Sequence, residues 1–487
     1  MDSCRVGKVL VRLLPIANAP CAVDDDARTI IAPSVLPFRC KLAASSLVAA
    51  KRRCLSGRME ERGLRAKPFR PIIFNPAIGD LSSLIAPPYD IIGEGECAEL
   101  LARHPFNIVR LILPPTLKGT QTDRYEEAGR LWQRWLREGV VQEWDEANLF
   151  VYVQRFSWRG TQREHWALLA AIPLFDYETG LVRPHEWTMP KPKSDRLLLL
   201  RAIGAELSQV HGLLSDETGE WQGVLQSAAK GEAWLRAHLN GVEHLVWRID
   251  DPAFGEAVNC LLANQWLVIA DGHHRYETAL AFRKELPEAQ SDPDHPANFI
   301  GIVLADYQHN ATVLPTHRLF RFAQPESVER LLRELMRRFR TVNANWDGTD
   351  EGLERFLAEA PTVSFLVIAQ ERVKQVFVYG FESGVAQALE QLPPPLRKVD
   401  TAVLHHAVLP IVMAGAGIAP ESVTVSYTQD APNAHAFAQD EGCLAVLLRP
   451  VPLDLVREVA AQGYRLPPKT TYFIPKAPSG LVMRRLR

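Results

Sequence analysis

The sequence has little cysteine, no long apolar run and almost no net charge. Only 7 of its 487 residues are cysteine. The three that lie beyond residue 58, Cys97, Cys260 and Cys443, are too few and too scattered for a disulfide framework or a cysteine-based zinc site, which favours a reducing, cytoplasmic environment. No window offers about 18 uninterrupted apolar residues, so we expect no membrane span.

Two further absences narrow the class of protein. A net charge of −2 argues against a protein that coats nucleic acid, because that role needs a basic excess on one face. The sequence has no Gly-x-x-x-x-Gly-Lys-Ser/Thr loop, which excludes an ordinary P-loop enzyme. With 47% hydrophobic and 23% charged residues, the composition is that of a globular protein, and the length predicts two or three domains.

Residues 1–58 differ in charge from the rest of the chain. They carry ten Lys or Arg against four Asp, a net of +6, which leaves −8 for the remainder. An arginine-rich, acid-poor leader is typical of a targeting segment. Because Arg12 interrupts its apolar stretch and Met59 offers another start, we interpret residues 1–58 as a disordered leader or a start-site extension.

Apolar periodicity predicts an α/β protein with mixed sheets. Alternating apolar runs predict strands at 70–74, 106–113, 149–156, 166–173, 298–306, 311–320, 363–369, 376–379, 423–427 and 443–448. Helical spacing predicts helices at 124–138, 197–205 and 325–341. We place a boundary near 322, which gives one domain over residues 59–322 and a second α/β domain over residues 323–487.

The stretch 267–280 is the most informative of the chain. It joins an apolar run to a helix-forming segment through Gly272, which can adopt backbone angles that other residues avoid. The amides and dipole of a helix start form an anion site. The alternative is an ordinary Asp-Gly connection between a strand and a helix. An acid, two imidazoles and a forked cation beside the turn favour phosphate chemistry: Asp271, His273, His274 and Arg275.

Other polar groups are candidates for the same site. Asp90 follows a rigid Pro-Pro-Tyr lead-in, where it either presents a carboxylate or caps a turn. The predicted loop 183–196 gathers a histidine, acids and cations that contact either solvent or a ligand: His185, Glu186, Lys191, Lys193, Asp195 and Arg196. His273 and Glu277 share a helix face, but two ligands do not make a metal site. Weaker candidates are His185, Glu186, His317, Arg318, Asp400, His405, His406, Lys469, Tyr472 and Lys476.

The string Asp271–Arg275 resembles the active-site turn of the free-serine kinases, which belong to the ParB/sulfiredoxin superfamily and hold nucleotide phosphates on a Gly-x-x-Arg turn. The chain also resembles a prokaryotic family catalogued as a domain of unknown function. This second resemblance spans roughly residues 66 to 487 and is carried by the strings 86–92, 184–188, 193–201, 314–318 and 469–476.

The resemblance implies a ParB/sulfiredoxin-like nucleotide domain over residues 59–322. It implies that the terminal phosphate of ADP or ATP passes to a small hydroxylated amino acid, with free L-serine as the first candidate. In that scheme Gly272 and Arg275 hold the phosphates and Asp271 helps hold Mg²⁺. His273 or His274 would stabilise charge on the transferred group.

In the free-serine kinases an acidic residue N-terminal to the glycine turn takes the proton of the serine hydroxyl. Asp90 is our candidate for that base and Glu186 is the next, although the kinase acid lies nearer the turn and is typically Glu. Two alternatives stay open. One is a ParB-like nucleotide-binding switch without metabolite chemistry, and the other is a phosphatase or hydrolase that uses the paired histidines. The sequence leaves the oligomeric state open.

Overall fold

The computed structural model describes residues 63–114, 123–360, 363–379 and 384–487. The predicted leader, residues 1–58, lies outside this part of the chain. The described strands form sheets of eight, six, four and two strands, and helices pack on the larger sheets, so the predicted α/β class with mixed sheets is confirmed. None of the described helices is long and apolar enough to cross a membrane.

The eight-stranded sheet carries the glycine turn. In order of pairing its strands are β5 (Val182–Pro184), β10 (Leu267–Asp271), β7 (Val210–Leu214), β11 (Phe299–Asp306), β4 (Thr161–Pro173), β3 (Leu149–Trp158), β9 (Val242–Ile249) and β8 (Leu235–Leu239). The sheet is mixed, because β10 runs parallel to β5 but antiparallel to β7. The paired strands predicted at 149–156 and 166–173 are β3 and β4.

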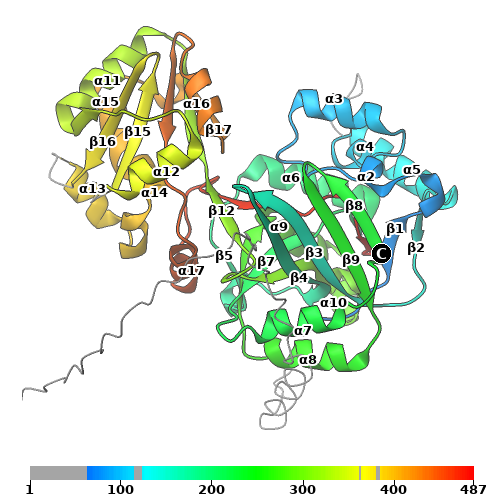
Figure 1. Cartoon of the computed structure of the whole chain (residues 1–487). Helices are drawn as coiled ribbons and strands as arrows, with labels where there is room; N and C mark the ends of the chain where they lie inside the picture. The colour runs from blue at the N-terminus through cyan, green and yellow to red at the C-terminus, as the bar shows by residue number, and fades with distance from the viewer. Residues whose placement is uncertain (1–62, 115–122, 361–362, 380–383) are drawn as a thin grey trace, which may run out of the picture. The chain divides into compact units, whose positions relative to one another are not determined.

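Both faces of this sheet are covered, because alternate side chains of a strand point to opposite faces. Val151 and Val153 of β3 pack in one core with α7 (Glu220–Ala228) and α8 (Pro252–Leu262), which lie side by side beneath the sheet in Figure 1. Tyr152 belongs to the core of the opposite face. Burial on both faces explains why these strands are apolar almost throughout.

The predicted strand, turn and helix around Gly272 are confirmed. Strand β10 ends at Asp271, Gly272 has a φ of 92°, and α9 (His273–Glu285) begins at the next residue. A φ of 92° lies in the left-handed region that glycine alone adopts freely.

The four-stranded sheet joins the two ends of the described chain. Its order is β2 (Val141–Glu143), β1 (Pro71–Phe74), β20 (Met483–Arg485) and β6 (Ala205–Glu206). The core beside it contains residues of α3 (Glu94–Arg103), α4 (Val109–Ile112), α5 (Asp123–Arg137) and α6 (Pro190–Ile203). Helix α5 confirms the helix predicted at 124–138. Arg484 of β20 is buried, and its Nε lies 2.9 Å from Glu206 Oε2.

Three predicted segments differ from the structure. The strand predicted at 106–113 is wrong: the interval contains α4, and the first residue of this helix, Val109, donates its amide to Asn107 Oδ1 at 2.9 Å. The predicted loop 183–196 ends early, because α6 begins at Pro190. The strand predicted at 311–320 is two strands, β12 (Thr312–Pro315) and β13 (His317–Phe322).

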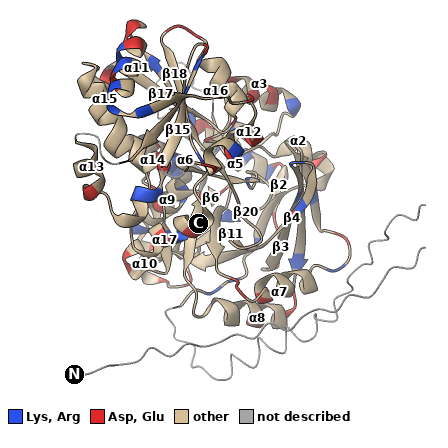
Figure 2. Cartoon of the chain, turned by 60° about the vertical axis from the view of Figure 1, so that its left-hand side comes forward, with Lys and Arg blue, Asp and Glu red and all other residues tan. Residues whose placement is uncertain are grey.

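The six-stranded sheet is antiparallel throughout and includes β13. Its order is β14 (Arg340–Asn343), β16 (Arg372–Val378), β15 (Val363–Ala369), β18 (Cys443–Leu447), β13 and β17 (Val423–Thr428), which confirms the four strands predicted after residue 360. Helix α11 (Glu326–Arg338) confirms the helix predicted at 325–341, and Figure 2 shows basic and acidic residues interspersed along it.

Further helices accompany these sheets: α2 (Leu81–Leu84), α10 (Pro287–Ser291), α12 (Asp350–Ala358), α13 (Val385–Gln391), α14 (Asp400–Val403), α15 (Leu409–Gly415), α16 (Ala431–Phe437) and α17 (Leu453–Ala461). The two-stranded sheet pairs β12 with β19 (Thr471–Ile474). The boundary near 322 stays a prediction. Cys97 and Cys443 are free thiols, and Cys260 is disulfide-bonded.

Replacing Arg484 tests how firmly β20 is held. In Arg484→Met, the buried carboxylate of Glu206 loses its ion pair, and breaking such a pair costs about 3–5 kcal/mol of unfolding free energy. Arg485→Met is the matched control, because the partly exposed Arg485–Glu143 pair contributes about 0–1 kcal/mol. Denaturant titration measures both. Equal, small losses would show that the buried pair does not secure the strand.

Candidate functional site

A cleft of about 640 Å³ draws its lining from many parts of the described chain. All seven residues that the sequence placed in the site line it: Asp90, Glu186, Asp271, Gly272, His273, His274 and Arg275. Besides Glu186, three of the weaker candidates line it too: Lys469, Tyr472 and Lys476. The structure therefore brings three segments to one place: the glycine turn, the Pro-Pro-Tyr-Asp segment at residues 87–90, and residues 469–476, which we call the C-terminal segment.

The Gly272 turn requires glycine for two reasons. Its φ of 92° is strained for any residue with a Cβ, and a Cβ there would lie 3.0 Å from Arg275 Nε. The Tyr276 amide donates to the Gly272 carbonyl at 2.9 Å and makes the first intrahelical bond of α9. The amides of residues 273–275 therefore have no acceptor within the helix, and with its dipole they offer an anion site at the cleft.

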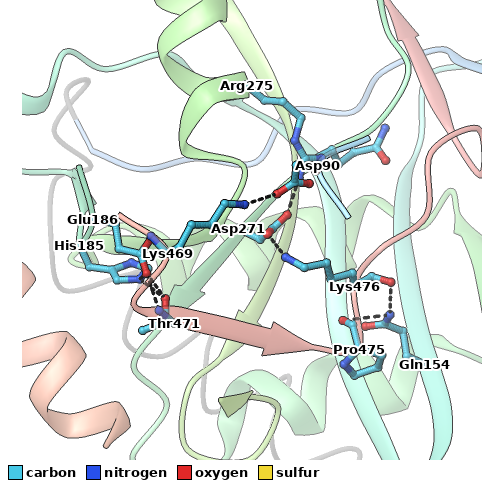
Figure 3. A network of polar contacts seen from close by, with 11 residues as sticks. Asp90, Gln154, His185, Glu186, Asp271, Arg275, Lys469, Thr471, Pro475 and Lys476 are labelled. Carbon is cyan, nitrogen blue, oxygen red and sulfur yellow. Dashed lines mark hydrogen bonds and ion pairs between the residues drawn. The ribbon is translucent and has the colours of Figure 1, made fainter. Parts of the chain in front are cut away.

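Asp271 is held between two cations (Figure 3). Its Oδ1 contacts Lys476 Nζ, and its Oδ2 accepts from Arg275 Nη2 at 2.5 Å. Burial opposes ionisation of Asp271, but Lys476 and Arg275 outweigh it and hold its pKa well below the usual value. Arg275 also donates to the carbonyl of Gln209, the residue before β7, so its guanidinium holds Asp271 and this backbone as well as lining the cleft.

Asp90 and Lys469 form the more open ion pair of the cleft. Lys469 Nζ lies 3.2 Å from Asp90 Oδ2, and the two side chains are 33% and 27% exposed. Figure 3 shows Lys469 reaching toward Asp90 from the C-terminal segment, beside Asp271. A ligand can therefore reach both the carboxylate and the ammonium.

Glu186 anchors the C-terminal segment. Its carboxylate accepts from the amides of Lys469, Thr470 and Thr471 at 3.1, 3.1 and 2.6 Å, and from the Thr471 hydroxyl at 2.5 Å. Burial alone raises the pKa of Glu186, but contacts that include the neighbouring His185 outweigh burial and lower it to about 2. Glu186 is therefore an ionised acceptor that fixes the backbone from which Lys469 extends.

Arg318 holds the same segment from the other side. It is fully buried, and its Nη1 donates to the carbonyls of Thr316 and Lys469 at 2.7 and 2.8 Å. Burial lowers the pKa of Arg318 to about 10. Glu186 thus accepts from the amides of the segment while Arg318 donates to its carbonyls, which fixes Lys469 although its φ is 56°.

The two adjacent histidines are both neutral at pH 7. Burial, reinforced by His185, lowers the pKa of His273 to about 3. Burial and then Lys469 lower the pKa of His274. The Met189 amide donates to His274 Nε2 at 2.9 Å, so this neutral imidazole carries its proton on Nδ1. His274, which lines the cleft, therefore has its Nδ1 proton available as a neutral hydrogen-bond donor.

Several remaining candidates serve structural contacts outside the lining. Lys193 pairs with Glu277 at 3.2 Å, and the Arg196 guanidinium lies 4.0 Å from the ring centroid of Tyr89, which lines the cleft. The side chain of Lys191 lies outside the described residues. Asp195 pairs with Arg124, Asp400 pairs with Arg449 at 2.6 Å, and His405 accepts from Arg318 at 3.0 Å.

The residues described do not build a metal site by themselves. No group of three or more His, Cys, Asp or Glu among them is placed to hold an ion. Asp271, which the resemblance assigns to Mg²⁺, already has a cation at each oxygen. The residues present therefore fit a phosphate better than a metal held by protein ligands alone.

Trp187 and Tyr427 also line the cleft and were not among the predicted site residues. Trp187 had a signal in the sequence, because it directly follows Glu186 in the string 184–188. Tyr427 had none, because alternating polarity in an edge strand does not show which cleft the strand borders.

The chain belongs to the family described as a protein of unknown function, DUF1015, whose model matches residues 66–407. No curated protein matches the chain. Several solved structures are also similar to it. A conserved hypothetical protein from Pyrococcus furiosus is 15% identical, with coverage of 64% of this chain and 93% of that chain and a TM-score of 0.33.

A free serine kinase in complex with AMP is 15% identical, with coverage of 63% of this chain and 87% of that chain and a TM-score of 0.32. SbnI with a C-terminal truncation, from Staphylococcus aureus, is 10% identical, with coverage of 63% and 84% and a TM-score of 0.33. These values are too low to assign an activity.

The depressed pKa of Glu186 predicts a loss of stability in acid. A carboxylate whose folded pKa is lowered stabilises the fold above its unfolded pKa, near 4.5, and this contribution is lost as pH falls toward about 2. The loss amounts to roughly 3 kcal/mol of unfolding free energy. Glu186→Gln should remove this pH dependence, which denaturant titration between pH 6 and 2 would measure.

At neutral pH, Glu186→Gln should itself cost about 2–3 kcal/mol, because an amide nitrogen would face backbone donors. Glu277→Gln is the control, since Glu277 accepts from one hydroxyl and one ammonium rather than from three amides. If Glu186→Gln lost as much unfolding free energy between pH 6 and 2 as wild type does, the anchoring role of Glu186 would be contradicted.

Proposed function

We propose that the protein is a nucleotide-dependent phosphotransferase that moves the terminal phosphate of ADP or ATP to the hydroxyl of a small amino acid, with L-serine as the first candidate. One observation carries the proposal: the open helix start at Gly272 and the Asp90–Lys469 pair line a single cleft. The resemblance of the string Asp271–Arg275 to the free-serine kinases supports the choice of L-serine as the phosphate acceptor. We place the reaction in the cytoplasm, where nucleotides and amino acids meet.

The phosphates fit the turn for electrostatic reasons. The amides of residues 273–275 and the dipole of α9 favour an anion, and Lys469 adds a positive charge beside them. A volume of about 640 Å³ lies within the roughly 300–1,000 Å³ of small-molecule sites. Mg²⁺ belongs to the proposal as an ion carried by the phosphates, since it usually binds few carboxylates and keeps waters.

The transfer step requires a base close to the phosphates. The serine Oγ forms a bond to the terminal phosphorus, the bond from that phosphorus to the bridging oxygen breaks, and the hydroxyl proton passes to Asp90. Of the three predicted site carboxylates, Glu186 is held by backbone amides and Asp271 by two cations, whereas Asp90 is partly exposed and pairs only with Lys469 among the contacts of the described residues. His274 donates from Nδ1 to the transferred group.

Incubation of the full chain with ADP or ATP, Mg²⁺ and pooled amino acids, followed by mass spectrometry, tests this function. We expect a phosphorylated hydroxy amino acid together with AMP or ADP. Nucleotide turnover that is the same with and without amino acids would favour the ParB-like switch. Hydrolysis of phosphoserine without nucleotide would favour a phosphatase.

Asp90→Asn tests the base. General-base assistance contributes about 10²–10⁴-fold, so amino-acid-dependent turnover should fall by that factor while nucleotide affinity survives. Asp440→Asn is the control, because Asp440 pairs with Arg321 at 3.1 Å and does not line the cleft. Turnover of Asp90→Asn within twofold of wild type would remove Asp90 from this role.

Arg275→Ala tests the anion site. Loss of a charge-assisted contact should weaken ADP binding about ten- to hundredfold. Arg283→Ala, in the same helix, removes a guanidinium that donates to the Leu174 carbonyl at 2.6 Å outside the cleft. Both variants should lose stability, but only Arg275→Ala should lose affinity in titration calorimetry. Equal ADP affinities in the two variants would contradict the assignment.

A further inference from the structure

Exposed apolar surface is concentrated in the cleft. Six large hydrophobic side chains of the described residues are exposed, and three of them line the cleft: Trp187, Val425 and Tyr427. Trp187 is the most exposed of the six, at 57%. Exposed apolar side chains gathered in a concave site indicate a ligand that covers them.

Trp187 is fixed in place although it is exposed. Its amide donates to the Leu466 carbonyl at 3.1 Å, and it directly follows the anchored Glu186. The guanidinium of Arg465 lies 4.6 Å from the Trp187 ring and 5.1 Å from the ring of Tyr177. A cation packed on an indole restrains the indole. Ligand stacking on Trp187 therefore costs little further entropy of the Trp187 side chain.

The cleft therefore has two chemically different parts. The turn at Gly272, with Lys469 and Lys476, is cationic, whereas Trp187 and Tyr427 present aromatic surface. Inorganic phosphate or polyphosphate would use only the cationic part. A nucleotide would use both, because it joins an anionic chain to a flat base.

We propose that Trp187 is the base-stacking residue of the site and that Val425 and Tyr427 complete an aromatic and apolar subsite for the nucleobase. The inference rests on the proposed function and deepens it, since it makes a nucleoside diphosphate or triphosphate the phosphate donor and excludes inorganic polyphosphate. Trp187 is the better residue to test, because Tyr427 also packs against the guanidinium of Arg318 at 5.0 Å.

The test compares two ligands on three variants of the full chain. Trp187→Ala should bind ADP about ten- to hundredfold more weakly than wild type, as loss of one base–aromatic stack does, and should bind tripolyphosphate with unchanged affinity. Trp187→Phe should retain most of the ADP affinity. Tyr464→Ala is the control, since Tyr464 is 37% exposed but does not line the cleft. Titration calorimetry measures each affinity.

Unchanged ADP affinity in Trp187→Ala would overturn the base subsite alone. Equal losses for ADP and tripolyphosphate would also overturn it, because Trp187 would then act on the anion site. A wild-type chain that binds tripolyphosphate but not ADP would also overturn the base subsite. A wild-type chain that binds neither ligand would overturn the proposed function together with this inference.

Discussion

The Glu186 carboxylate determines where the C-terminal segment crosses the cleft. It accepts three consecutive amides and one hydroxyl from residues 469–471, which leaves little freedom to the backbone there. Lys469 and Lys476 extend from the two ends of this segment toward Asp90 and Asp271. Without this anchor, the backbone at Lys469 would depend on the hydrogen bond from Arg318.

The electrostatics of the cleft follow from the same arrangement. Two cations keep Asp271 ionised although it is buried, and burial keeps His273 and His274 neutral. The positive charge of the site therefore resides on Lys469, Lys476, Arg275 and the start of α9 rather than on histidines. Such a distribution suits phosphates, because it does not depend on the titration of an imidazole near neutral pH.

Local chemistry made the glycine turn predictable from the sequence. A strand, Gly272 and a helix start are specified by adjacent residues, and their geometry is as expected. The family strings also marked Asp90 and Glu186 before the structure brought them to one cleft. The strand predicted at 106–113 was wrong because Asn107 accepts from the first amide of α4 while its side-chain nitrogen donates to the carbonyls of Ser83 and Ile85, a tertiary contact that apolar periodicity does not report.

Partners distant in sequence could not be predicted. Lys476 pairs with Asp271 across 205 positions, and Lys469 with Asp90 across 379. The sequence therefore indicated which residues line the cleft but not which carboxylate each cation engages. Glu186 is an example. Its residue type fits a general base, whereas its hydrogen bonds with the amides of residues 469–471 make it an anchor of the C-terminal segment.

A crystal structure of the chain with ADP would test the central claim most directly. We expect the terminal phosphate of ADP to accept hydrogen bonds from the amides of residues 273–275 and to lie within hydrogen-bond distance of Lys469 Nζ. Density for the phosphates elsewhere, with the amides of the Gly272 turn unoccupied by the ligand, would contradict it.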